Sequence, residues 1–114
     1  MTPMLMNKAE LKKALDGVPK DEHMSIALCY LPITQIGGSV KYDRRQAAEA
    51  LSKYYRRKAA EYWEKHRHCA INNRQSGIFR RRAEDYQSRA AKIEHIMLRW
   101  EKEENESEDR QAIL

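Results

Sequence analysis

A helical pattern that runs from Asp43 to Glu104 limits the folds open to this chain of 114 residues. Apolar residues return every three or four positions, which is the spacing of one stripe along a helix. In the second half of the pattern the stripe consists of Phe79, Ala83, Tyr86, Ala90, Ile93, Met97 and Trp100. Such a stripe has to pack against another surface, so the pattern predicts long helices that lie side by side.

Turn-forming residues interrupt this pattern near residues 71–77, where asparagine, serine and glycine replace the apolar stripe. The segments on either side, 43–70 and 78–104, have similar lengths. The sequence therefore predicts a long antiparallel helical hairpin over residues 43–104, packed like a coiled coil. One alternative stays open, because the apolar register continues through the break. A single helix of about sixty residues would then form a homodimer to cover its stripe.

Residues 1–42 are predicted to form a small unit that caps the hairpin. Asn7 and Glu10 have the spacing of a capping box at the start of a short helix. Gly17 and Pro19 follow that helix and are typical of its end. The first element of the chain is therefore expected to be a short, well-capped helix.

Two interpretations remain open between residues 24 and 42. The apolar segment 24–32 favours a helix, whereas residues 33–42 surround Gly37-Gly38, which could form a two-residue hairpin turn. The predicted fold class is all-α, with a short N-terminal helical unit and a long antiparallel helical hairpin. The alternative is an α+β fold with a small N-terminal β-hairpin near residues 33–42.

Composition narrows the class of protein. With 41% hydrophobic and 34% charged residues, the chain is apolar enough to fold but richer in charge than an average globular domain. It shows neither a secretory signal nor an apolar run that would span a membrane. We expect a cytoplasmic protein in which Cys29 and Cys69 are free thiols.

Charge is distributed unevenly along the chain. Residues 41–99 hold sixteen basic and seven acidic residues, whereas residues 100–114 hold two basic and six acidic ones. The helical region is therefore cationic, and residues 105–114 are expected to form a flexible acidic tail. A cationic surface attracts anionic partners, among which nucleic acid is the commonest.

Basic and aromatic residues provide the candidate binding site. Arginine binds phosphate and carboxylate groups in a bidentate manner, and a tyrosine ring can stack on bases. The candidate contacts to nucleic acid or to a protein partner are Lys53, Tyr54, Arg56, Arg57, Arg67, Arg74, Arg80, Arg81, Arg82 and Arg89.

Signs of catalysis or of metal binding are weak. His66 and Cys69 have the spacing of a metal-binding pair on a helix, but His68 points elsewhere and no second pair with ligand spacing follows. The chain also shows no cofactor-binding motif and no nucleophile with an orienting acid. The sequence therefore predicts neither a metal nor a cofactor, and no enzyme activity.

Two functional hypotheses remain. In the first, this small basic helical protein contacts nucleic acid, mainly by neutralising phosphates and with little readout of bases. In the second, it is an adaptor or inhibitor that docks on a host enzyme that processes nucleic acid, in the manner of small phage-type modulators. The sequence does not decide between the nucleic acid and the protein partner.

Overall fold

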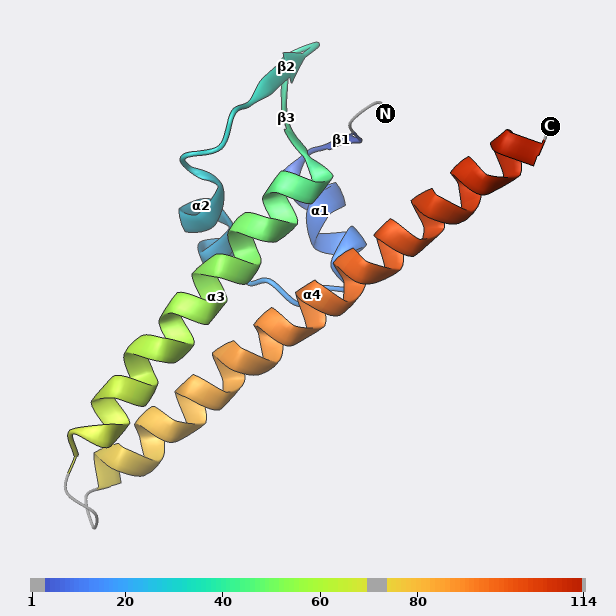
Figure 1. The fold of residues 1–114 in the computed structure, drawn as a ribbon. Coiled ribbons are helices and arrows are strands. Elements are labelled where there is room, and N and C mark those ends of the chain that lie inside the picture. The colour runs from blue at the N-terminus through green and yellow to red at the C-terminus, as the bar shows by residue number, and fades with distance from the viewer. Residues whose placement is uncertain (1–3, 70–73, 114) are drawn as a thin grey trace.

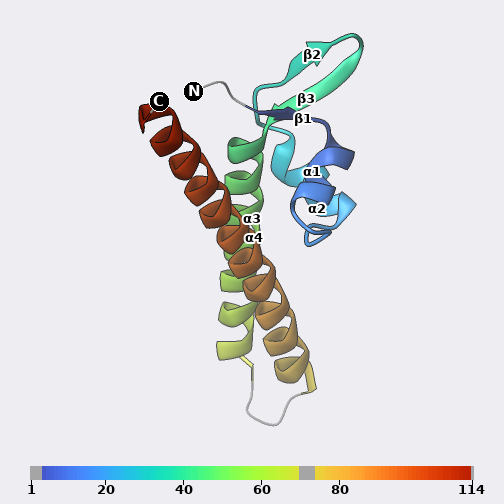
Figure 2. The same cartoon turned by 90° about the vertical axis from the view of Figure 1, so that its right-hand side faces the viewer.

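The computed structural model describes residues 4–69 and 74–113, with side chains described up to Glu106. Two long helices, α3 (Arg44–Arg67) and α4 (Arg74–Ile113), run in opposite directions and form a hairpin. A smaller N-terminal unit packs on one side of this hairpin, away from its loop (Figures 1 and 2). The molecule measures 63 × 37 × 19 Å. The predicted helical hairpin is confirmed, and the single long helix is excluded.

The hairpin is held together by the apolar stripes of its two helices. Asp43 caps α3, because its carboxylate accepts hydrogen bonds from the backbone N–H groups of Arg45 and Gln46, at 2.9 and 3.2 Å. The buried residues of the interface include Ala48, Leu51, Tyr55 and Ala59 of α3 and Ala83, Ala90, Ile93 and Trp100 of α4. The four residues of α4 belong to the apolar stripe that periodicity predicts for this helix.

Two arginines at the start of α3 contact α4 at the open end of the hairpin, where the two helices diverge (Figure 1). The Arg44 guanidinium lies 4.2 Å from the centroid of the Trp100 ring. Glu104 forms ion pairs with Arg44 at 3.4 Å and with Arg45 at 2.6 Å. The acidic end of α4 is thus held against the basic start of α3.

The N-terminal unit contains α1 (Lys8–Ala14) and α2 (Asp21–Leu28). The capping box of α1 is present: the Asn7 side chain accepts a hydrogen bond from Glu10 N–H at 2.8 Å, and Glu10 accepts one from Asn7 N–H at 3.2 Å. The apolar residues of this unit join the core of the hairpin, and the fully or nearly fully buried ones are Leu11, Leu15, Met24 and Leu28.

A small antiparallel sheet corrects the predicted all-α class. Its strands β1 (Leu5–Met6), β2 (Thr34–Ile36) and β3 (Ser39–Asp43) lie in the order β1-β3-β2. Gly37 and Gly38, with φ of +58° and +84°, form the two-residue turn between β2 and β3. The fold is therefore mostly helical, with the β-hairpin that the sequence left as the alternative, while α2 occupies the first part of segment 24–32.

Two boundaries of the hairpin also differ from the sequence prediction. The loop was placed at residues 71–77, but α4 begins at Arg74, so Ser76 and Gly77 are helical; residues 70–73 lie outside the described residues. His66 Nδ1 lies 2.9 Å from the carbonyl oxygen of Ser76, which ties this first turn to α3. At the other end, α4 continues through residues 105–113, where a flexible tail was expected. Glutamate, glutamine, alanine and arginine are strong helix formers, which explains this extension.

Candidate functional site

A row of aromatic rings runs along the hairpin from the N-terminal unit toward the loop end. His23 and Tyr55 have ring centroids 5.3 Å apart, and Tyr55 and Tyr86 lie at 6.0 Å. Tyr86 stacks on Tyr62 at 5.6 Å with an angle of 19°, and Tyr62 lies 6.1 Å from Phe79. Tyr55 is fully buried, whereas Tyr86, Tyr62 and Phe79, which follow it toward the loop end, are half-buried. Aromatic surface therefore becomes accessible toward the loop end.

Cations gather at the accessible end of this row. The Arg82 guanidinium lies 5.6 Å from the centroid of the Tyr62 ring and donates a hydrogen bond to its hydroxyl at 3.4 Å. Lys65 Nζ lies 4.8 Å from the same centroid and 5.9 Å from that of Phe79. Lys20 and Arg81 line the groove beside these residues. We call this site the aromatic–cationic groove and define it by Lys20, Tyr62, Lys65, Arg81, Arg82 and Tyr86.

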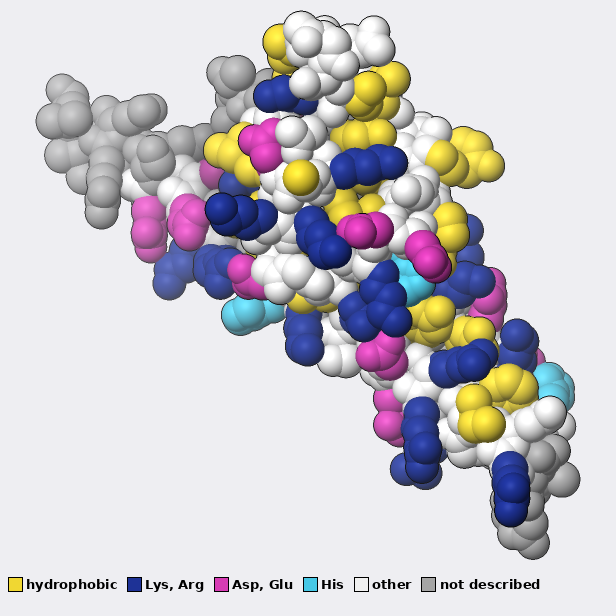
Figure 3. Space-filling view, turned by 180° about the vertical axis from the view of Figure 1, so that it is seen from behind, with side chains coloured by type: hydrophobic (Ala, Val, Ile, Leu, Met, Phe, Trp, Pro, Cys, Tyr) yellow, Lys and Arg dark blue, Asp and Glu magenta, His cyan; other side chains and the backbone are white. Residues whose placement is uncertain are grey.

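The groove carries an excess of positive charge. Within the described part of the chain, none of its four cations has an acidic partner at ion-pair distance. Asp85 also lines the groove, but it pairs with Arg89 at 3.2 Å. Figure 3 shows this face of the molecule, where Lys and Arg side chains alternate with hydrophobic ones along the loop half of the hairpin. Such a surface favours anions.

Tyr86 adds a neutral hydrogen-bonding group to the groove. Burial raises the pKa of its hydroxyl above the ordinary value, although Lys58 and Arg82 act in the opposite direction. The hydroxyl therefore stays protonated near neutral pH. A protonated phenol can donate a hydrogen bond to an anion, so this ring supplements the four cations.

Three of the ten predicted contact residues have side-chain contacts with other parts of the fold. Tyr54 is only 8% exposed and packs on His23, so its ring is not free to stack on a base. Arg56 donates two hydrogen bonds across the hairpin to Glu94, at 2.8 and 3.0 Å. Arg89 donates to the carbonyl of Val18. The Tyr54 ring is thus part of the core, and Arg56 and Arg89 have partners within the fold, so a role of these three side chains in binding stays a prediction.

Four other predicted residues lie on the loop half of the hairpin with different partners. Arg67 pairs with Glu64 at 2.6 Å and Arg80 with Glu84 at 3.2 Å, both on the exposed surface. Such pairs contribute only a few tenths of a kcal/mol, so both guanidinium groups remain available. The other two, Arg81 and Arg82, line the groove itself. Arg81 and Arg82 are thus the two predicted residues that the groove contains, and their role in binding stays a prediction.

The remaining predicted residues lie elsewhere. Arg74 is exposed at the first residue of α4. Lys53 and Arg57 line a second groove, between α2 and α3, together with Ile26 and Tyr30. The ten residues therefore do not form one continuous cationic face.

Lys20, Tyr62, Lys65 and Tyr86 belong to the groove but were absent from the predicted site. Tyr62 and Lys65 are three residues apart on α3, and this spacing, which puts them on one side of the helix, was a signal in the sequence. Lys20 comes from the segment before α2. Its position depends on how the N-terminal unit packs, so helical periodicity contained no signal for it.

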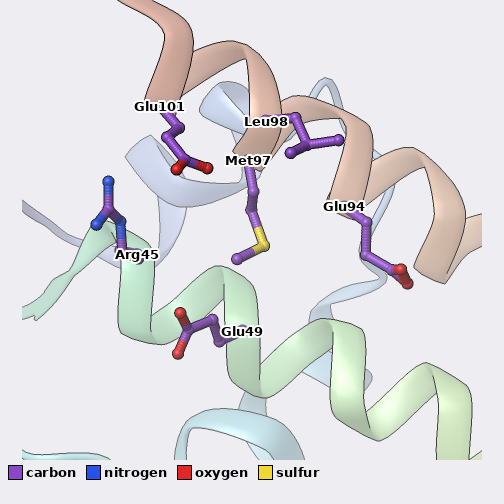
Figure 4. Close-up of a pocket in the computed structure, with 6 residues that line it drawn as sticks. All are labelled: Arg45, Glu49, Glu94, Met97, Leu98 and Glu101. Atoms are coloured by element: carbon purple, nitrogen blue, oxygen red, sulfur yellow. The ribbon is translucent and has the colours of Figure 1, made fainter. Parts of the chain in front are cut away.

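The other side of the hairpin has an acidic groove, which Figure 4 shows in close-up. Its lining residues are Arg45, Glu49, Glu94, Met97, Leu98 and Glu101. Arg45 already pairs with Glu104, and Glu94 with Arg56. Glu49 and Glu101 have no ion pair within the described part of the chain, so this groove repels phosphate. The two sides of the hairpin therefore differ in electrostatic character.

The histidines near the hairpin loop have protein partners. His66 Nδ1 lies beside Ser76, and His68 Nε2 lies 2.9 Å from a Glu64 oxygen. The carboxylate of Glu64 has a lowered pKa, mainly because of the hydrogen bond from His68 and the charge of Arg67. No cluster of three or more histidine, cysteine or acidic side chains suited to a metal ion occurs among the described residues.

Comparisons with protein-family models, curated proteins and solved structures found no match to this chain. Within the part of the chain that the structure describes, none of the helices combines the length and the apolar character needed to cross a membrane.

Proposed function

We propose that this protein binds nucleic acid by contacting phosphates in the aromatic–cationic groove. The observation that supports the proposal is that Lys20, Lys65, Arg81 and Arg82 gather beside the rings of Tyr62 and Tyr86, with no acidic partner among the described residues. A polyanion would release its counterions on contact with these cations, which is the main source of affinity for nucleic acid.

The rings hold two of the cations in place. Arg82 and Lys65 both lie over the Tyr62 ring, so part of the conformational freedom of their long side chains is already lost before binding. Tyr62 is also stacked on Tyr86, which occupies ring surface that a base would need. We therefore expect phosphate contact with little readout of base sequence.

The proposal predicts how steeply the affinity for nucleic acid should fall as the salt concentration rises. Each phosphate neutralised contributes about −0.9 to the slope of log affinity against log salt for duplex DNA, and about −0.7 for a single strand. If all four cations bind phosphates, the slopes would be about −3.6 and about −2.8.

The test removes two exposed cations of the groove that have no ion pair, in the double variant Lys20→Ala/Arg81→Ala. We expect weaker binding to all sequences alike and a slope reduced in magnitude by about 1.8 on duplex DNA. Fluorescence anisotropy at several salt concentrations measures both quantities. The matched control is Lys13→Ala/Lys102→Ala, which removes the same charge from exposed positions outside the groove.

Two results would reject this proposal. One is the absence of binding by the unmodified protein to single- and double-stranded DNA and RNA at low salt. The other is an equal loss of affinity in the groove variant and in the control, because net charge and not the groove would then determine binding.

A second candidate function has its own observation. The groove between α2 and α3 exposes Ile26 and Tyr30, the latter 93% exposed, beside the cations Lys53 and Arg57. Apolar and aromatic surface bordered by arginine is typical of protein interfaces, so this groove supports the adaptor or inhibitor hypothesis. Tyr30→Ser together with Arg57→Ala should then abolish capture of a protein from nuclease-treated lysate, while Lys20→Ala/Arg81→Ala should leave the capture unchanged.

A further inference from the structure

Strand β2 forms an open edge of the small sheet. It pairs with β3 on one side, through Thr34 with Lys41, Gln35 with Val40 and Ile36 with Ser39. All three residues of β2 are exposed. Figures 1 and 2 show that the β2–β3 hairpin projects from the N-terminal unit at the end of the molecule opposite to the loop between α3 and α4.

The geometry of the turn shows which backbone groups face this open edge. Gly37 and Gly38 both have positive φ, as in a type I′ turn, which closes on a hydrogen-bonded pair, here Ile36 and Ser39. Hydrogen-bonded and non-hydrogen-bonded pairs alternate along an antiparallel ladder. Gln35 therefore belongs to a non-hydrogen-bonded pair with Val40. Its N–H and C=O groups point away from β3, toward the free edge.

This edge lacks charge, which is one of the features that usually prevent strands from pairing between molecules, although β2 is only three residues long and Pro32 precedes it. Proteins protect edge strands with charged side chains, proline or bulges. Here no residue from Met24 to Val40 carries a charge, in a chain that is 34% charged. Ile33 and Ile36 are also 54% and 52% exposed. The edge is thus uncharged and has exposed isoleucine side chains in and next to β2.

We propose that β2 pairs with β2 of a second copy of this chain, antiparallel and about a twofold axis at Gln35. In this arrangement the N–H of each Gln35 donates to the C=O of the other, and Thr34 lies opposite the partner's Ile36. The two sheets become one continuous sheet.

Charge restricts the surfaces through which a second copy can approach. The chain has a net charge of +5, so most orientations of two copies bring cations together. An encounter through the uncharged segment avoids this repulsion. An antiparallel pair of identical strands also satisfies the backbone groups of both copies, as a twofold interface requires.

The first test uses the outward direction of the Gln35 amide. Gln35→Pro removes that N–H, and an edge position whose N–H faces solvent tolerates proline, so the β2–β3 hairpin should be kept. Gln35→Ala is the matched control, because it changes the side chain but keeps the N–H group. In sedimentation equilibrium, the unmodified protein and Gln35→Ala should pass from monomer to dimer with concentration. Gln35→Pro should stay monomeric with an unchanged circular dichroism spectrum.

The second test measures the register directly, in a background with Cys29→Ser and Cys69→Ser. The Cα atoms of two paired residues at position 35 would lie about 5.5 Å apart, within the range that a disulfide bridges. Val40 lies on β3, so its two copies would be about 14 Å apart. Mild oxidation by oxidised glutathione should therefore cross-link Gln35→Cys into a dimer and leave Val40→Cys monomeric.

Several outcomes would overturn the proposed pairing. They are a protein that remains monomeric at every concentration, a dimer that persists in Gln35→Pro, and equal cross-linking of Gln35→Cys and Val40→Cys. A different occupant would be assigned to the edge if the protein stayed monomeric but captured an unrelated protein, and if Gln35→Pro abolished that capture. None of these results depends on whether the aromatic–cationic groove binds nucleic acid.

Discussion

The hydroxyl of Tyr55 connects α3 to the segment that leads into α2. It accepts a hydrogen bond from the backbone N–H of Lys20 at 3.2 Å and lies 3.0 Å from His23 Nδ1. Burial raises the pKa of this hydroxyl and lowers the pKa of His23, so the phenol is protonated and the imidazole neutral at neutral pH. The Tyr55 O–H can then donate to Nδ1. We expect Tyr55→Phe to weaken the attachment of the N-terminal unit to the hairpin.

The size of this effect follows from what the substitution removes. Phenylalanine keeps the ring and its contacts with His23 and Tyr86, so little apolar burial is lost. The N–H of Lys20 loses its acceptor, and an unsatisfied buried group costs about 1 to 3 kcal/mol. Because this hydrogen bond is only partly buried, we expect the lower part of that range, about 1 to 2 kcal/mol of unfolding free energy.

Tyr54→Phe is the matched control for this measurement. Tyr54 is the next residue on α3, and its hydroxyl makes no hydrogen bond within the described part of the chain. Its loss should change the unfolding free energy by about 0.5 kcal/mol or less. Urea denaturation followed by circular dichroism gives both values, provided that the slope of the unfolding free energy against urea concentration is the same in both variants and in the unmodified protein. Equal effects of the two substitutions would refute the assigned role of the Tyr55 hydroxyl.

Two further predictions concern the core and its response to pH. Ile93→Ala, at a fully buried position, should lower the unfolding free energy by about 2 to 5 kcal/mol. Phe79→Ala should lower it less, because Phe79 is only half-buried. Equal urea midpoints of the two variants would contradict this prediction. The pKa of His23 is lowered from its ordinary value of 6.5 by burial and by the charges of Lys20 and Arg89. As the pH falls below about 6.5, the unfolded chain binds the proton first, so stability should fall toward the lower folded pKa. His23→Gln should remove this part of the pH dependence, and an unchanged pH profile of the urea midpoint would show that His23 does not cause it.

Periodicity was sufficient to predict the long-range packing of the hairpin. Residues of one stripe, such as Ala90 and Ile93, are buried because helical spacing alone determines which side of a helix they occupy. The capping box at Asn7 was also readable, since both of its hydrogen bonds lie within four consecutive residues. Local rules therefore predicted these elements well.

The predictions were wrong where tertiary contacts decide. Tyr54 and Tyr55 are adjacent in sequence, and only the packing of His23 against them shows that both rings belong to the interior. Arg56 is a surface cation, but its partner Glu94 lies on the other helix of the hairpin, so its sequence neighbours do not reveal this ion pair. The glycine pair allowed the β-hairpin, yet its formation depended on how the neighbouring strands paired. Sequence spacing contains none of this information.

Strand β2 contributes no residue to the aromatic–cationic groove, so a dimer through β2 would carry two such grooves. A nucleic acid long enough to reach both grooves would bind the second one as an intramolecular step, which raises the apparent affinity without any new contact. Gln35→Pro should then weaken binding to long duplexes and leave binding to short ones unchanged, whereas Lys20→Ala/Arg81→Ala should weaken both. Anisotropy titrations with a short and a long duplex of the same composition would distinguish these patterns. An equal effect of Gln35→Pro at both lengths would show that the two grooves do not act together.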